Sequence, residues 1–200
     1  MSDTLQTVGI LGGSFNPVHI GHLMLASYLK QFAGLDAVWL TLSPLNPLKT
    51  HPGALIPDLE RLQMLKIATQ NAVEGIGVCD IELSMPRPSY TINTLKVLSR
   101  RYPRKRFKLI VGSDNWRIFE QWKDYQTILD DYGVIVYPRP GYPVPNRYED
   151  GMEVVDAPLS SLSSTFVRSA ISRGKDMTYF FPAGVYEYIC QRGLYIPEKK

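Results

Sequence analysis

The 200-residue chain has 22 Lys and Arg residues against 19 Asp and Glu, a formal net charge of +3, and 44% of it is hydrophobic. These values are typical of one globular domain over residues 1–200, and they indicate no nucleic-acid or membrane-surface partner. Two cysteines are too few for a disulfide framework and favour a reducing compartment. Because no secretion signal or membrane-spanning stretch is recognisable, we expect a soluble, cytoplasmic protein without a membrane partner.

The first predicted element is a strand at residues 7–11, a short apolar run typical of a strand buried on both faces of a parallel sheet. It leads into GGSFNPVHIGH and then into a predicted helix that continues through residues 23–32. Gly12 and Gly13 let backbone N–H groups approach a ligand closely, and the fixed φ of Pro17 suits a helix entry. Because a helix N-terminus offers unpaired N–H donors and partial positive charge, this loop predicts a polyphosphate site.

Two histidines close this run. His19 and His22 are three residues apart on the first helical turn, so both can donate to the same phosphoryl oxygens. The alternative is a tight turn with unrelated surface or core histidines, but two of the three histidines in the chain fall in this short window. The run contains neither the GK[ST] of a P-loop nor the GxGxxG of a dinucleotide loop, so a third phosphate-binding scheme is indicated.

The rest of the chain alternates apolar runs with amphipathic segments. Strands are predicted at residues 36–43, 77–83, 107–111, 133–137 and 152–157. Helices are predicted at residues 59–71, 91–101 and 116–130, and a tail helix over residues 183–191 has Pro182 in its first turn and Gly193 in the left-handed position after its end. Because parallel neighbours need crossover helices, the pattern predicts an α/β fold with a doubly wound parallel sheet and a small helical C-terminal part.

A second helix start lies near the C-terminus, in the run LSSTFVR at residues 162–168. Ser163, Ser164 or Thr165 would be its N-cap, and Arg168 would lie on its first turn. Taken alone, this run is also typical of an ordinary capped surface helix.

Together the two runs resemble the GGxFxPxHxGH and ISSTxxR boxes of the nucleotidylyltransferase superfamily, which has a Rossmann-like fold. Class I aminoacyl-tRNA synthetases share the first box, but nothing here is similar to their lysine-rich second box. The resemblance implies that His19 and His22 stabilise the α-phosphate of a nucleoside triphosphate while Arg168 holds the β- and γ-phosphates. Further phosphate contacts are implied for the loops and the second helix start, at Gly12, Gly13, Ser14, Phe15, Lys49, Ser164 and Thr165.

Four middle segments narrow the resemblance to bacterial nicotinate-nucleotide adenylyltransferase: ERLQML, RPSYTINTL, IVGSDN and GVYEYI. That family joins ATP to nicotinate mononucleotide with Mg²⁺, which is held mainly by the substrate phosphates, and releases pyrophosphate. The resemblance implies that backbone amides near Thr91 and Lys123 hold the nicotinate carboxylate, that Trp122 stacks on the ring and that Asp114 binds the ribose. No protein metal site is implied.

Alternatives remain for several of these residues. Trp116 and Trp122 lie in an amphipathic stretch, where tryptophan is more often core than ligand platform, although the resemblance favours Trp122 as a platform. Asp114 could instead be a helix N-cap, and the basic run at residues 100–108 is typical of a solvated turn rather than of an RNA-binding surface. Two positions depart from the family pattern: Leu48 replaces a histidine, and Asn93 replaces an acidic residue.

The absence of a Ser-His-Asp or Cys-His set from the sequence favours direct in-line attack without a covalent intermediate. Two rival functions remain at this stage. The first is nucleotidyl transfer to another acceptor, such as nicotinamide mononucleotide or phosphopantetheine, because both phosphate boxes are superfamily-wide. The second is a non-catalytic nucleotide-binding module, which would have no need for donors on the transferring phosphate. A homo-oligomer is left open.

Overall fold

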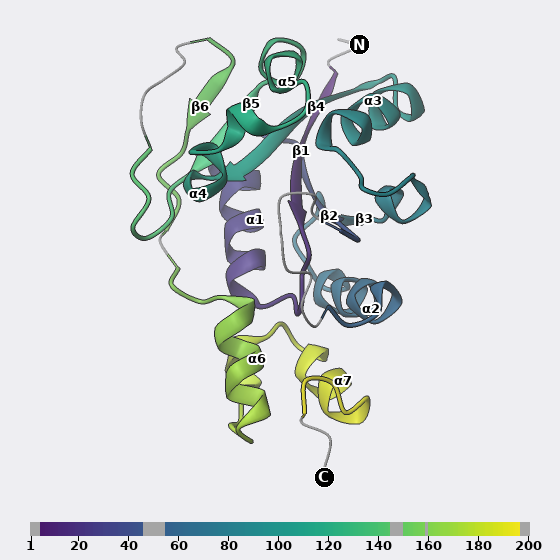
Figure 1. Ribbon diagram of the computed structural model, residues 1–200, viewed down its shortest axis with the longest axis vertical. Coiled ribbons are helices and arrows are strands. Elements are labelled where there is room, and N and C mark those ends of the chain that lie inside the picture. Colours follow the sequence, from purple (N-terminus) through teal and green to yellow (C-terminus); the bar gives the residue numbers. More distant parts are fainter. Residues whose placement is uncertain (1–4, 46–54, 145–149, 159, 197–200) are drawn as a thin grey trace.

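The computed structural model describes residues 5–45, 55–144, 150–158 and 160–196. Its strands form one parallel sheet in the order β3-β2-β1-β4-β5-β6 (Figure 1). Their bounds are β1 Gln6–Gly13, β2 Ala37–Leu42, β3 Ile76–Cys79, β4 Lys105–Gly112, β5 Val134–Tyr137 and β6 Met152–Val154. The chain moves outward from β1 to β3 and then crosses to β4 on the other side of β1. The carboxyl ends of β1 and β4 therefore flank the switch point at which open α/β sheets bind ligands.

Helices cover both faces of this sheet. The α-helices are α1 Ile20–Phe32, α2 Asp58–Thr69, α3 Thr91–Arg101, α4 Ser113–Trp116, α5 Tyr125–Asp131, α6 Ser164–Ser172 and α7 Val185–Gln191. Three short 3₁₀ helices are η1 Ile81–Ser84, η2 Phe119–Gln121 and η3 Thr178–Phe180. In Figure 1, α6 and α7 lie beyond the carboxyl end of β1, which is the predicted helical C-terminal part. The doubly wound parallel sheet is confirmed, whereas a single domain over residues 1–200 stays a prediction.

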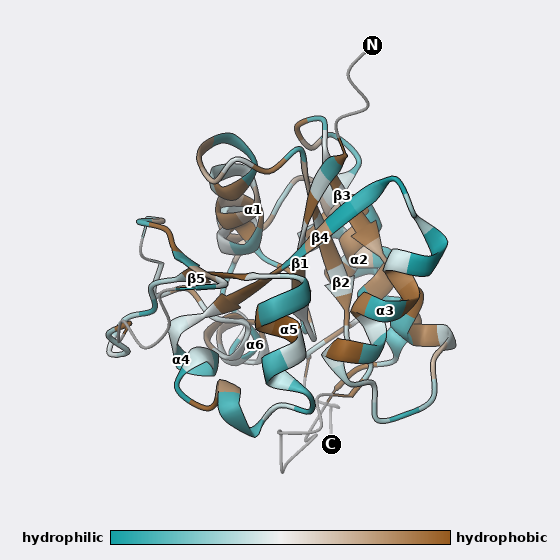
Figure 2. Cartoon of the chain, turned by 90° about the horizontal axis from the view of Figure 1, so that it is seen from above, coloured by the Kyte–Doolittle hydropathy of each residue, from teal (hydrophilic) through white to brown (hydrophobic). Residues whose placement is uncertain are grey.

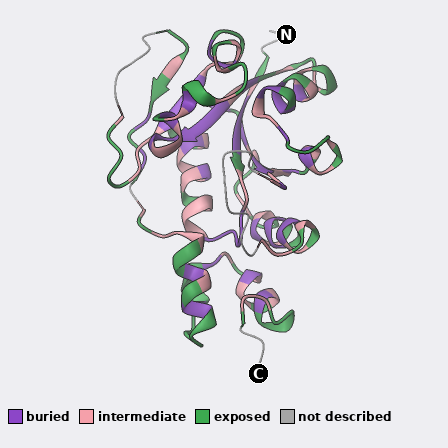
Figure 3. Ribbon diagram, in the orientation of Figure 1, coloured by how far each residue is buried: buried purple, intermediate pink, exposed green. Residues whose placement is uncertain are grey.

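Alternation along the strands explains the two helical layers. Leu11 and Ile110 pack into a cluster with α1, α2, α6 and α7, whereas Ile10 and Leu109 pack into a second cluster with α3 and α5. Successive strand side chains point to opposite faces, so a strand that is apolar throughout supplies both cores. Figure 2 shows the hydrophobic strands enclosed between the helices, and Figure 3 shows the same strands buried while the helices expose their outer faces.

Four predicted elements differ from those observed, and the first is the strand predicted at residues 152–157, which ends at Val154. The strand predicted at residues 77–83 ends at Cys79, because the chain turns into η1, where Glu82 accepts a hydrogen bond from the Thr94 side chain of α3. The helix predicted at residues 116–130 is divided into α4, η2 and α5, and Asp124 takes a left-handed φ of 52° where α5 begins. Pro182 precedes the first turn of α7, which begins at Val185. Gly193 does have the predicted left-handed φ, at 61°.

The C-terminal helix is attached to α2 through one carboxylate. Glu60 accepts a 2.6 Å hydrogen bond from the Tyr188 hydroxyl and pairs with Arg192 at 2.5 Å. The Arg192 and Tyr188 hydrogen bonds lower the pKa of the Glu60 carboxyl. No helix in the described part of the chain combines the length and apolarity needed to cross a membrane.

Candidate active site

A cavity of about 530 Å³ opens at the carboxyl ends of β1, β4 and β5. It contains all the sequence-predicted site residues that the structure describes, namely Gly12, Gly13, Ser14, Phe15, His19, His22, Thr91, Asp114, Trp122, Lys123, Ser164, Thr165 and Arg168. Lys49 and the departure at Leu48 lie outside the described residues. Asn93, the other departure, is an exposed residue of α3 and does not line the cavity. Residues from distant parts of the chain therefore share one cavity that is large enough for a substrate.

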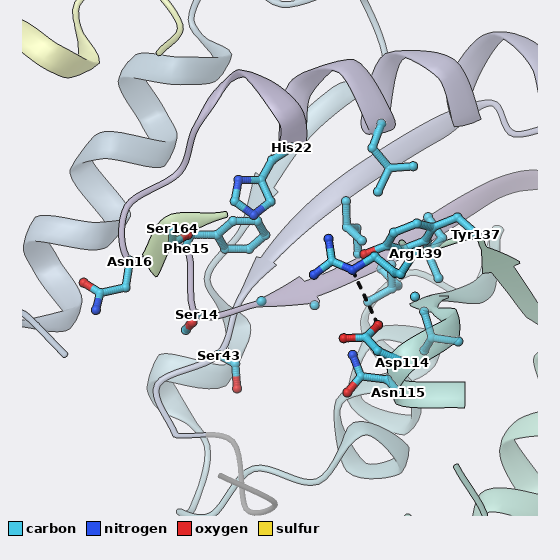
Figure 4. A pocket seen from close by; sticks show the side chains of 18 of the residues that line it. Ser14, Phe15, Asn16, His22, Ser43, Asp114, Asn115, Tyr137, Arg139 and Ser164 are labelled. Carbon is cyan, nitrogen blue, oxygen red and sulfur yellow. Dashed lines mark ion pairs between the residues drawn. The ribbon is translucent and has the colours of Figure 1, made fainter. Parts of the chain in front are cut away.

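The glycine loop forms the floor of the cavity beside α1. A Cβ on Gly13 would lie 3.0 Å from the Phe15 ring, so the glycine lets this ring fold back over the loop. Phe15 is buried at a left-handed φ of 42°, and its ring meets His22 edge-on with centroids 5.0 Å apart. Figure 4 shows the His22 ring above the Phe15 ring at the cavity. The contact with the Phe15 ring therefore helps to fix the position of the His22 ring.

His19 is the N-cap of α1 and His22 is its third residue, so the predicted placement on one turn is confirmed. Their rings stack with centroids 3.8 Å apart. The His19 backbone N–H donates to Nδ1 of His22 over 3.1 Å, which leaves Nε2 to carry the proton of the neutral ring. Gly21 allows this packing, because a Cβ there would lie 3.2 Å from the His19 ring.

Both histidines are held in the neutral form. Burial lowers the pKa of His19 to about 4, and the nearby charge of Arg139 adds to the effect. The pKa of His22 is also well below its usual range, because of burial first and then of the charges on His19 and Arg139. Near neutral pH the pair therefore supplies neutral N–H donors rather than a fixed positive charge.

The start of α6 borders the same loop. Among the three candidate N-caps, Ser163 has this role, since its side chain accepts the Phe166 N–H over 3.2 Å. The Ser164 hydroxyl donates to the Pro17 carbonyl over 2.8 Å. Arg168 is the fifth residue of α6 rather than a first-turn residue, and its guanidinium donates to the Asn16 carbonyl over 2.7 Å. Helical side chains lean toward the N-terminus, which explains how Arg168 still reaches the cavity.

The opposite side of the cavity is formed by the start of α3 and by η2. Thr91 is the first residue of α3, and Nζ of Lys123 lies 4.9 Å from the centroid of the neighbouring Tyr90 ring. Trp122 is half-buried at the end of η2 and lines the cavity. Trp116 is 2% exposed and stacks on Phe119, so the core alternative is confirmed for this tryptophan.

Asp114 lies just beyond β4 and is the second residue of α4. Gly112 is the N-cap of that helix, so the N-cap alternative for Asp114 is wrong. The carboxylate faces Arg139 instead, with Oδ1 and Nε 3.6 Å apart (Figure 4).

Two charged residues of the cavity were missed by the sequence reasoning. Arg139 follows β5, its backbone N–H donates to the Ser113 hydroxyl over 2.8 Å, and its guanidinium faces the cavity in Figure 4. Its position just past the carboxyl end of a predicted strand was a usable signal. Glu82 is buried and accepts hydrogen bonds from Ser89 at 2.7 Å and Thr94 at 2.9 Å. Burial raises the pKa of Glu82, and no local pattern indicated its role.

Several known proteins are similar to this chain in sequence. The profile of the cytidylyltransferase-like family matches residues 10–170. A protein of Bacteroides fragilis named probable nicotinate-nucleotide adenylyltransferase is 46% identical over 188 residues, which cover 92% of this chain and 91% of the relative. A protein of the same name from Flavobacterium johnsoniae is 39% identical over 191 residues, covering 94% and 98% of the two chains.

A solved structure has the same fold. Nicotinic acid mononucleotide adenylyltransferase of Plasmodium falciparum, complexed with NaAD, superposes with a TM-score of 0.78 at 18% identity, covering 95% of this chain and 97% of that one. At this identity the likeness concerns the fold, whereas the bacterial relatives match in sequence over nearly the whole length. The chain therefore belongs to the nicotinate-nucleotide adenylyltransferase family of cytidylyltransferase-like proteins.

Proposed function

We propose that this enzyme transfers the adenylyl group of ATP to nicotinate mononucleotide, forming nicotinate adenine dinucleotide and pyrophosphate in NAD biosynthesis. The observation that supports this best is the single cavity, because it joins the two phosphate boxes to the acceptor residues predicted around α3 and η2. The sequence relatives carry the name of this activity. The two free cysteines, buried Cys79 and exposed Cys190, are compatible with a reducing cytoplasm as the site of the reaction.

The reaction needs one bond to form and one to break. An oxygen of the acceptor phosphate attacks the α-phosphorus of ATP, and the bond between that phosphorus and the bridging oxygen to the β-phosphate breaks as pyrophosphate leaves. A phosphate monoester is largely ionised near neutral pH, so no strong general base is required. The work of the protein is positioning and stabilisation of charge on the phosphoryl oxygens.

Each donor has a proposed task in this step. Nε2–H of His22 and the neighbouring His19 ring donate to the α-phosphate oxygens as charge develops there. Arg168 leaves its present carbonyl acceptor and, together with Ser164, Thr165 and Lys49, holds the β- and γ-phosphates. Arg139 adds a positive charge on the acceptor side of the histidines. Asp114, which faces Arg139, is assigned to the ribose of the acceptor.

Mg²⁺ fits this cavity as a companion of the substrate. In the described part of the chain, His, Cys, Asp and Glu side chains form no group of three that could hold a metal ion. Of the cavity carboxylates, Glu82 is occupied by hydroxyl donors and Asp114 faces Arg139. We therefore propose that Mg²⁺ would be held mainly by the phosphates of ATP, and that it would supply positive charge near the leaving pyrophosphate.

The start of α3 would distinguish nicotinate mononucleotide from nicotinamide mononucleotide. The nicotinate carboxylate would be received by backbone N–H groups near Thr91 and Lys123, at the positive end of an 11-residue helix. Trp122 would stack on the pyridine ring. The amide of nicotinamide mononucleotide would turn its NH₂ toward these donors, which is an unfavourable contact.

A pyrophosphate-release assay tests the proposal. Purified enzyme is given ATP and Mg²⁺ with nicotinate mononucleotide, nicotinamide mononucleotide or phosphopantetheine, and CTP replaces ATP in a parallel series. We expect turnover with ATP and the nicotinate acceptor, and product of the mass of nicotinate adenine dinucleotide. Preferred use of another acceptor or of CTP would overturn the substrate assignment. If no combination of nucleoside triphosphate and acceptor releases pyrophosphate, the result would support a nucleotide-binding module instead.

A further inference from the structure

Arg61, in the second turn of α2, has no exposed surface. Its guanidinium donates to five acceptors, namely the carbonyls of Ser14 (2.5 Å), Ser43 (3.0 Å), Ile56 (3.3 Å) and Pro44 (3.4 Å) and the carboxylate of Asp58 (2.5 Å). A buried arginine is costly unless its charge is paired and its N–H groups are satisfied. Asp58 pairs the charge and the four carbonyls satisfy the remaining N–H groups, so this arginine also connects α2 to the segments that carry those carbonyls.

Three of those carbonyls belong to two loops at the nucleotide cavity. Ser14 comes from the loop after β1, whereas Ser43 and Pro44 come directly after β2. Ser14 and Ser43 both line the cavity, as Figure 4 shows, but Arg61 does not. The same Nη1 atom of Arg61 binds both serine carbonyls. Arg61 therefore binds the backbone of both loops from a buried position outside the cavity lining.

This contact sets the direction of one peptide group. In a trans peptide the C=O and the following N–H point in opposite directions. Since the Ser14 carbonyl points at Arg61, the N–H of Phe15 points away from Arg61. The φ of Phe15 is +42°, a left-handed conformation that non-glycine residues rarely adopt and that surrounding contacts must hold in place. Arg61 provides such a contact on the adjoining peptide.

We propose that Arg61 is a positioning residue for adenylyl transfer, which holds the Ser14–Phe15 peptide so that the Phe15 N–H faces the cavity as an anion donor. The inference rests on the proposed function for the identity of the anion, the triphosphate of ATP or the pyrophosphate product. Arg61 itself touches no substrate. A purely structural role would predict loss of stability with unchanged anion binding in the molecules that remain folded.

The test observes the Phe15 amide directly. The chain has seven phenylalanines, so [¹⁵N]Phe labelling yields few amide signals, and Phe15→Leu identifies the one to follow. Titration of the wild type with inorganic pyrophosphate and Mg²⁺ should shift the Phe15 signal, whereas buried Phe107 in β4 should stay nearly unchanged. Pyrophosphate that binds without moving the Phe15 signal overturns the inference. If pyrophosphate does not bind at all, the proposed function fails instead.

Arg61→Met and Arg61→Lys then test the guanidinium. We expect Arg61→Met to lower kcat/KM for ATP about 10²-fold, as for loss of one preorganised donor, with a much smaller change in the KM of the acceptor. The Phe15 shift should be lost. Arg61→Lys should be intermediate, because one ammonium cannot span the same acceptors as the guanidinium fork.

Arg192→Met is the matched control, because Arg192 also pairs with a carboxylate in the first turn of α2 but belongs to α7. It should keep the wild-type Phe15 shift and the wild-type KM for ATP. A folded Arg61 variant that retains wild-type pyrophosphate affinity and Phe15 shift overturns the inference. Unfolding of both Arg61 variants would assign this arginine to the fold alone and would overturn it as well.

Discussion

In the proposed reaction the histidine pair acts through its ring protons rather than through charge. Because burial and Arg139 favour neutral rings, His19 and His22 would contribute hydrogen bonds that strengthen as negative charge develops on the α-phosphate. We expect His19→Ala and His22→Ala each to lower kcat by about 10²–10³ with small changes in nucleotide affinity. Steady-state pyrophosphate release at saturating substrates measures this. Near-wild-type kcat in either variant would remove that histidine from the mechanism.

The hydrogen bond to Nδ1 of His22 allows a sharper prediction. Since Nδ1 accepts the His19 N–H, only Nε2 can donate to the substrate. The side-chain NH₂ of glutamine can take the place of Nε2–H, whereas that of asparagine lies closer to the position of Nδ1. We therefore expect His22→Gln to retain several times more kcat than His22→Asn, provided that the two unfold at similar temperatures. The reverse order would show that the ring donates through the other nitrogen.

At the scale of elements, we assign the arginine of α6, Arg168, to the leaving-group side of the proposed reaction. Arg168→Ala should weaken ATP and pyrophosphate together, by about 10- to 100-fold, since charge-assisted hydrogen bonds to the β- and γ-phosphates are lost. The affinity for nicotinate mononucleotide should remain nearly unchanged. Isothermal titration with each ligand separates the two effects. An equal loss for the mononucleotide would indicate that Arg168 acts by supporting the loop through Asn16.

We assign the choice of acceptor to the start of α3 and the end of η2. If backbone donors near Thr91 and Lys123 receive the nicotinate carboxylate, kcat/KM should favour the acid over the amide by at least about tenfold. Trp122→Ala should reduce kcat/KM for both mononucleotides by a similar factor, because stacking does not depend on the acid or amide group. The KM for ATP should be almost unaffected. Equal use of both acceptors by the wild type contradicts the assignment, and an unaffected variant removes Trp122 from the acceptor pocket.

Some helices and strands could be predicted from sequence patterns alone, and others could not. The strand at residues 7–11 and the helix at residues 91–101 were predicted well, because a short apolar run and helical periodicity are local properties. The helix predicted at residues 116–130 was wrong, because its amphipathic pattern suits separate short turns as well as one continuous helix. The burial of Phe119 and the left-handed φ of Asp124 favour separate short turns over one continuous helix. Both features depend on packing with the rest of the structure.

At the scale of the whole molecule, the buried histidines couple stability to pH. The folded-state pKa of His19 is about 4, below the unfolded value of 6.5, so between these values the unfolded chain binds a proton that the folded chain does not. The free energy of unfolding should therefore fall as the pH drops from 7 to 5, by about 2 kcal/mol from His19 alone.

Urea unfolding of wild type and His19→Gln at both pH values isolates this contribution. The comparison is necessary because Glu82, whose pKa is raised by burial, changes stability in the opposite direction over part of this range. The variant should lose less stability between pH 7 and pH 5 than the wild type. The same pH dependence in both proteins would show that the His19 ring is not the group that titrates.

The amino-acid sequence by itself placed candidate phosphate-binding residues at two helix starts. The glycines and the two histidines are recognisable because their spacing along a short backbone segment already places them on one loop and one helical turn, whereas Arg168 is recognisable through the family resemblance. Only the tertiary structure decided how the cavity is completed. Arg139 meets Asp114, Glu82 holds α3, and Arg61 supports the phosphate loop from α2. These partners are distant in the chain, and they meet only because the packed sheet orders the strand ends on which their loops begin.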